Sequence, residues 1–298
     1  MPEPRYVGGQ AVMEGVMMRG ATTWAVSVRT PTGDIRTEVN DAPVWATRWA
    51  KVPLARGLAT LAESMSLGIR AFTWSADQAV DPSRPMSAKA TGGTVAFAIV
   101  FFSAIFIVLP ALAARGIGGF FLEGSYAFNL FEGVLRLGIF LGYIALIGRL
   151  PDVRRLFMYH GAEHKAIAAY ENDVPLTAAS AQRFSTAHVR CGTNFLLTVM
   201  VVTILAYALF GRPGWIVLVA SRLLLIPVIA GLAYEMIRYA ARNMDKGWVA
   251  TAMKAGLALQ RLTTRPPTDD QIEVAIASLK AVLSPAQLAE VEARDRAA

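Results

Sequence analysis

Residues 90–114, ATGGTVAFAIVFFSAIFIVLPALAA, contain no charged side chain over 25 consecutive positions. A helix of this length can cross the ~30 Å hydrocarbon core of a bilayer. The composition of the whole chain agrees, because 54% of its 298 residues are hydrophobic and only 17% are charged. Soluble proteins of this size carry roughly a quarter charged residues. The sequence therefore predicts an integral membrane protein and argues against an ordinary soluble enzyme or a disordered chain.

Three further stretches have the length and apolar character of membrane spans, at residues 124–148, 191–211 and 213–234. The last two are joined only by residues 211–213, which favours a tight helical hairpin. We therefore expect a mainly α fold, a polytopic membrane helical bundle of about four spans. Charged side chains interrupt two of the stretches: Glu132 and Arg136 can pair along one helix face, and Arg222 could share Glu132. We interpret this group as an ion network that fixes helix packing, with a polar path through the bundle as the alternative.

Basic side chains are distributed unevenly among the loops. Residues 1–89 carry ten Lys or Arg and residues 149–190 carry six, whereas the loops at 115–123 and 211–213 carry one each. The positive-inside rule then places both termini and the long middle loop in the cytoplasm of a multi-pass protein of the inner or plasma membrane. In this setting the net charge of +7 indicates contact with anionic lipid. The lipid bilayer is the expected partner, and nucleic acid is not.

The segments outside the expected spans have their own patterns. Residues 8–20 contain four glycines, which disfavours a helix, and residues 24–29 and 35–39 predict a β-hairpin around a turn at 32–34. Residues 45–78 predict an amphipathic helix, broken near Pro53 and suited to a membrane surface. A capping-box sequence at 268–271 predicts the start of a last helix, with Ile272, Ala275, Ile276 and Leu279 on one face.

These patterns divide the chain into six segments. They are residues 1–44 with the Gly-rich motif and hairpin, 45–89 with the amphipathic interfacial helix, 90–148 with the first transmembrane hairpin, 149–190 with a cytoplasmic loop and helix, 191–234 with the second transmembrane hairpin, and 235–298 with a cytoplasmic helical region.

All three histidines of the chain fall within 29 residues, between the second and third expected spans. Two of them belong to HGAEH at residues 160–164, the H-x-x-E-H arrangement of inverted zinc proteases. On a helix, His160 and His164 share a face and can hold one Zn²⁺, while Glu163 can take a proton from water. In the alternative reading the histidines pack at the membrane interface, and Glu163 pairs with Lys165 or an arginine.

A metal site needs a third ligand, and several residues qualify. His188 is the first choice because it completes a three-histidine set, and Glu171 is the second because it lies two turns beyond His164 on nearly the same face. Cys191 and Glu235 are further options. Cys191 is the only cysteine, which excludes an internal disulfide framework, and it could equally be a small buried residue at the start of a span.

Four stretches together resemble the bacterial YqhQ family: GGQAVMEGVMMRG at 8–20, YHGAEHK at 159–165, RCGTNF at 190–195 and LTTRP at 262–266. The resemblance extends from Gly8 to about Leu279. A proline often precedes the Arg-Cys-Gly-Thr motif in such proteins, and Val189 stands there in this chain. The family is a domain of unknown function, usually described as a predicted metal-dependent membrane enzyme, and it implies no substrate. The resemblance directs attention to Glu14, His160, Glu163, His164, His188, Arg190, Cys191, Thr193 and Asn194.

These observations favour a metal-dependent, hydrolase-like enzyme at the cytoplasmic membrane face. In this hypothesis His160, His164 and His188 hold a divalent metal, with Zn²⁺ as the first candidate. Glu163 activates water, and Glu14 or Arg190 positions a peptide or lipid substrate. A non-enzymatic assembly or scaffold factor is the alternative. A small transporter is a weaker one, because four spans would have to form a homo-oligomer to enclose a path.

Overall fold

The computed structural model describes residues 7–79, 88–118, 124–188, 191–208 and 215–297. Its N-terminal part is an antiparallel sheet of four strands in sequence order, β1 (Gly8–Val12), β2 (Gly15–Arg19), β3 (Thr23–Arg29) and β4 (Ile35–Asp41). The predicted hairpin is confirmed as β3 and β4. The Gly-rich segment adds a second hairpin, β1 and β2. Gly15 is required there, because a Cβ at this position would come 2.1 Å from the carbonyl oxygen of Ser27.

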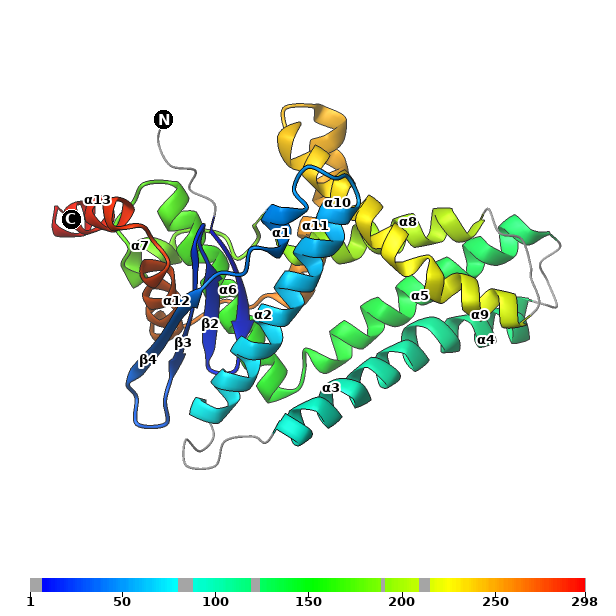
Figure 1. The fold of residues 1–298 in the computed structure, drawn as a ribbon, viewed down its shortest axis with the longest axis horizontal. Helices are drawn as coiled ribbons and strands as arrows, with labels where there is room; N and C mark the ends of the chain where they lie inside the picture. Colours follow the sequence, from blue (N-terminus) through cyan, green and yellow to red (C-terminus); the bar gives the residue numbers. More distant parts are fainter. Residues whose placement is uncertain (1–6, 80–87, 119–123, 189–190, 209–214, 298) are drawn as a thin grey trace.

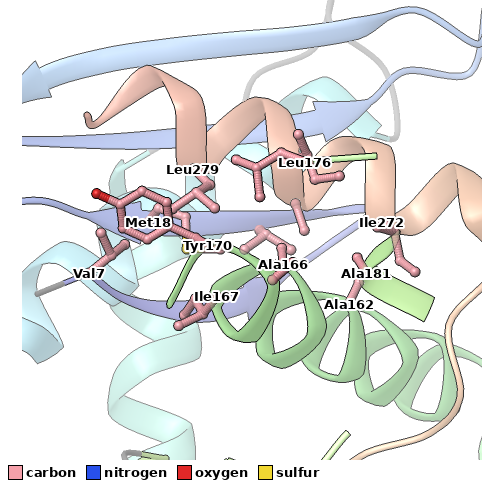
Figure 2. Close-up of a cluster of buried hydrophobic side chains, with 14 of the residues drawn as sticks. Val7, Met18, Ala162, Ala166, Ile167, Tyr170, Leu176, Ala181, Ile272 and Leu279 are labelled. Carbon is pink, nitrogen blue, oxygen red and sulfur yellow. The ribbon is translucent and has the colours of Figure 1, made fainter. Parts of the chain in front are cut away.

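Helices cover both faces of this sheet. Helix α2 (Ala55–Ala79) packs on one face, where Leu67 and Ala71 join a buried cluster with Trp24 and Val26. Helices α6 (Pro151–Glu171) and α12 (Asp269–Ala281) pack on the other face, and Figure 2 shows their apolar side chains gathered against the strands. The strand β1 forms one edge of the sheet, between the layers of α2 and α6.

Short helices complete this part of the molecule. They are α1 (Trp45–Arg48), α7 (Ala178–Gln182) and α13 (Pro285–Arg296). The longer helix α11 (Gly247–Thr263) packs instead against the apolar helices, where Leu259 joins a buried cluster with Phe106 and Phe140. The predicted amphipathic helix is broken between α1 and α2, near Pro53, as expected. The last predicted helix is confirmed as α12: its cap holds, with the backbone N–H of Thr268 donating to Gln271 Oε1 at 3.0 Å, and the expected apolar face is buried.

The apolar helices project away from the sheet, as Figure 1 shows. Helix α3 (Ala88–Ser103), the π-helical turn η1 (Ala104–Val108) and α4 (Leu109–Gly118) run on as one helix, and α5 (Ser125–Ile147) follows. Their stretches Gly92–Ile117 and Tyr126–Ile147 are long and apolar enough to cross a membrane, with mean hydropathies of 2.8 and 1.9. In the apolar 18-residue part of each stretch only 17% and 22% of the residues are buried, so these helices expose apolar surface.

The third and fourth expected spans border residues 209–214, which lie outside the described residues. Helix α8 (Gly192–Ala208) has 17 residues, and the last stretch is divided into α9 (Trp215–Leu224) and α10 (Ile226–Arg242). Pro227 lies in the first turn of α10, where its missing N–H is tolerated, and this explains why a new helix begins there. Within the described residues, two helices rather than four have the length and composition of a membrane span.

The predicted ion pair inside the apolar part is present. Arg136 Nη2 donates to Glu132 Oε1 at 2.5 Å, and both side chains are buried. The guanidinium of Arg136 also lies 5.5 Å from the ring centre of Tyr207 on α8. The pair therefore links α5 to α8, whereas the side chain of Arg222 lies outside the described residues.

Candidate metal centre

The H-x-x-E-H residues lie on the helix α6, as predicted. The imidazole rings of His160 and His164 are 4.5 Å apart between centroids, because positions one turn apart share a face. The helix itself begins at Pro151, a residue favoured in a first turn, and buries an apolar face against the sheet. This packing makes His164 almost fully buried, at 2% exposure, and leaves His160 half-buried.

Backbone carbonyl groups orient both imidazoles in the same way. His160 Nδ1 lies 2.8 Å from the carbonyl oxygen of Thr263, and His164 Nδ1 lies 2.5 Å from that of Thr186. When Nδ1–H donates to a carbonyl, the other ring nitrogen Nε2 is left with a lone pair for a ligand. Histidines that bind metals are commonly fixed by such hydrogen bonds.

Cys191 lies against these two histidines. Its Sγ is 3.2 Å from His160 Nε2 and 2.7 Å from the hydroxyl oxygen of Thr193. One ligand atom from each of His160, His164 and Cys191 can be chosen so that all three lie within 4.8 Å of one another. Two imidazoles and a thiol form a donor set that suits Zn²⁺, and three protein ligands leave a fourth position open.

Glu163 lies beside these residues and is almost fully buried, at 5% exposure. Its Oε2 atom is buried and has no hydrogen-bond partner among the described residues. Burial raises the pKa of this carboxyl to about 7, although the neighbouring His160 and His188 act to lower it. The alternative in which Glu163 pairs with Lys165 is not seen, because Lys165 Nζ donates to the carbonyl oxygens of Gln182 and Phe184.

His188 borders the centre without joining the three-residue cluster. Its ring lies 5.7 Å from that of His164, and its Nε2 lies 3.1 Å from Glu171 Oε2. Gln260 holds the backbone of His188 by accepting from its N–H and donating to its carbonyl oxygen, each at 2.8 Å. His188 and Glu171, the first two choices for a third ligand, are therefore paired with each other.

A cavity of about 590 Å³ opens onto this centre. It is bordered by β1, α2, α6, the start of α8 and α10, and its lining includes Gly9, Leu61, His160, Glu163, His164, His188, Cys191, Phe195 and Tyr234. Elements of the sheet layer and elements of the apolar part thus meet around one open space.

Other candidate residues lie elsewhere. Glu14 is at the turn between β1 and β2, where its carboxylate binds the guanidinium of Arg155 and accepts from Tyr159 Oη at 3.3 Å. Glu235 binds Arg56. Neither of these acids lines the cavity. Arg190 lies outside the described residues.

Several contacts at the centre are not evident in the sequence. Gly161 lets α6 approach the segment after α11 closely, since a Cβ there would come 2.2 Å from the carbonyl oxygen of Arg265. On α11, a Cβ at Gly256 would come 2.2 Å from Asn194 Oδ1. A glycine inside an otherwise regular helix was the one available signal of such contacts. Thr186 and Thr263 act through their backbone carbonyls, which every residue type has, so the residue type gave no signal of this role.

The structure defines a helical protein with two apolar helices of membrane-spanning length, a small antiparallel sheet and a cluster of two histidines and a cysteine. The family described as "Protein of unknown function (DUF1385)" matches residues 52–285, and the chain belongs to this family. It is 31% identical over 313 residues to "Uncharacterized protein YqhQ" of Bacillus subtilis (strain 168), an alignment that covers 96% of this chain and 95% of that protein. No solved structure matches the chain significantly.

Proposed function

We propose that this protein is a metal-dependent hydrolase whose site lies at the cytoplasmic face of the membrane. His160, His164 and Cys191 would hold a divalent ion, with Zn²⁺ as the first candidate. The observation that carries the proposal is the buried Oε2 of Glu163 beside this cluster, which has no hydrogen-bond partner within the part of the chain that the structure describes. A buried carboxylate oxygen without a hydrogen bond is costly, and such groups concentrate at functional sites.

The reaction would be the addition of water to a substrate carbonyl. A divalent cation bound there supplies Lewis-acid chemistry, polarising the carbonyl and making water more acidic. Glu163 would accept the proton of the attacking water at its carboxylate. As the bond between the carbonyl carbon and the leaving group breaks, Glu163 returns this proton to the leaving group. His188, which is paired with Glu171 and lines the same cavity, would stabilise the developing negative charge when both of its ring nitrogens carry a proton.

The membrane location is also part of the proposal. The proposal keeps four spans with both termini in the cytoplasm, an orientation supported by the uneven distribution of basic residues. Two of the four stretches form long apolar helices, which supports a membrane location. The predicted apolar stripe of α2 gives further support. Leu58, Met65, Ile69 and Phe72 of this stripe are exposed, whereas small residues such as Gly68 and Ala71 face the sheet. An exposed apolar stripe beside apolar helices suits a bilayer surface.

The test combines metal content with a catalytic readout. We expect detergent-purified protein to contain about one Zn²⁺ per chain by plasma mass spectrometry. His160→Ala, His164→Ala and Cys191→Ser should each release the ion. Glu163→Gln keeps its size but cannot accept a proton, so it should retain the ion and lose activity by a factor on the order of 10².

Complementation of a deletion phenotype is the first catalytic readout, since the natural substrate is undefined. The control is Glu171→Gln, which leaves the three proposed ligands in place and should keep the metal. Full complementation by Glu163→Gln would refute the hydrolase mechanism and favour the scaffold reading. Wild-type protein without bound metal would refute the metal site itself.

A further inference from the structure

The strand β1 has one side that pairs with β2 and one side that faces away from the sheet. The pairing of β2 with β3 shows which residues point in which direction. The carbonyl oxygen of Glu14 accepts from the N–H of Arg29 at 2.9 Å, and the N–H of Gly20 donates to Thr23 at 2.8 Å. Because hydrogen-bonding direction alternates along a strand, the even-numbered residues of β2 bond β3 and the odd-numbered ones bond β1.

It follows that residues 8, 10 and 12 of β1 bond β2, while the N–H and C=O groups of Gly9 and Ala11 point outward. Met13 follows the same alternation, and its outward N–H donates to Ser75 Oγ on α2 at 3.2 Å. Among the described residues no hydrogen bond occupies the outward groups of Gly9 and Ala11. The sheet therefore has an open edge two residues long, which ends at Ser75.

This open edge borders the candidate metal centre. A Cβ built on Gly9 would come 2.9 Å from Cγ of Glu163, so the strand passes directly over the proposed base. Gly8, Gly9 and Ala11 line the same cavity as His160 and Glu163. The cavity is walled on one side by Leu61 and Ser64 of α2 and on the other by Phe157 of α6, among others.

We propose that the substrate is a polypeptide, which binds in an extended conformation as an added strand along β1. This inference rests on the proposed hydrolase function and names its substrate class. An extended peptide offers N–H and C=O groups at the spacing of Gly9 and Ala11, so that main-chain hydrogen bonds align it with the edge. The absence of a side chain on Gly9 lets β1 lie against Glu163, and the paired peptide places a carbonyl beside His160 and Glu163. A lipid acyl chain has no groups to match this alternation.

The test uses the Zn²⁺-loaded full chain in detergent and three soluble hydroxamates. Acetohydroxamate probes the metal alone, a trialanine hydroxamate adds an extended peptide, and hexanoyl hydroxamate adds an apolar chain without amide groups. We expect the trialanine probe to bind at least about tenfold more tightly than acetohydroxamate in calorimetry. Ala11→Pro removes one outward N–H and should abolish this gain. The control Ala11→Gly keeps the N–H and should preserve it.

Two measurements distinguish loss of the edge hydrogen bond in Ala11→Pro from misfolding of this variant. Ala11→Pro should bind acetohydroxamate as the wild type does. With the wild-type protein, a trialanine hydroxamate that is N-methylated at the amide nitrogen of its central alanine should also lose its affinity advantage over acetohydroxamate. Three results would overturn the inference while leaving the hydrolase proposal intact. Ala11→Pro could bind the trialanine probe with the same gain in affinity as the wild type, the trialanine probe could show no gain over acetohydroxamate, or the hexanoyl probe could show a larger gain than the trialanine probe. Absence of both metal and hydroxamate binding would refute the proposed function itself.

Discussion

The carboxyl group of Glu163 is buried, and burial disfavours its charged form. Its pKa is raised from 4.5 to about 7 mainly by burial, so the folded chain binds this proton more tightly than the unfolded chain. The resulting stabilisation is complete below about pH 4.5 and is lost as the pH rises through 7. A shift of this size corresponds to about 3 kcal/mol at most.

We therefore predict that metal-free protein loses thermal stability between pH 5.5 and pH 8 to a greater extent than Glu163→Gln, which has no proton to lose. Melting temperatures in detergent with a chelator would measure the difference between the two proteins at each pH. Other titrating groups are common to both and cancel to first order. Parallel curves for the two proteins would contradict the assignment of the raised pKa to Glu163.

The residues of the centre were predictable to the extent that they are close in sequence. The spacing of His160, Glu163 and His164 was enough, because a helix fixes which positions share a face. The third cluster residue was not decided by spacing: His188 ranked first, and the fold instead brings Cys191 to 3.2 Å from His160. The two residues are only three positions apart, and the direction of the chain between them is set by tertiary contacts such as that of Gln260.

At the scale of elements, α2 and the β3–β4 hairpin followed from residue patterns and α12 from its capping sequence, whereas β1, β2, α11 and α13 were not predicted. Glycines hide strand periodicity because they carry no side chain that marks a face. Gly9 and Gly15 are nevertheless necessary, since a Cβ on either would come within 3.0 Å of neighbouring atoms. The helix lengths were also overestimated in the last apolar stretch, where Pro227 starts a new helix.

The pairing of α5 with α8 provides a prediction for the apolar part. Glu132→Leu leaves the guanidinium of Arg136 buried without its acid, and such a loss costs about 3–5 kcal/mol. The melting temperature in detergent should therefore fall. The double substitution Glu132→Leu with Arg136→Leu should recover much of this loss, because no buried charge then remains. A double variant no more stable than the single one would show that the pair does not hold these helices together.

At the scale of the whole molecule, the candidate centre lies where the sheet layer meets the apolar helices. Its cavity is bordered by β1 and α6 from the first part and by the start of α8 from the second. Figure 1 shows these two parts at opposite ends of the molecule. A site at their junction would act beside the membrane surface, on whichever side of the bilayer the sheet lies.

The proposed function therefore depends on which side of the bilayer the sheet and the cavity lie, and this can be measured. The ten basic residues before the first apolar helix and the single one in the loop at 115–123 predict that the sheet, α6 and α13 are cytoplasmic. In a Cys191→Ser background, single cysteines at Gly118 and Arg212 should react with an impermeant thiol reagent in intact cells. A cysteine at Ala289, an exposed position of α13, should react only after the cells are permeabilised. Labelling of Ala289→Cys in intact cells, with Gly118→Cys protected, would place the cavity on the outer side and exclude cytoplasmic substrates.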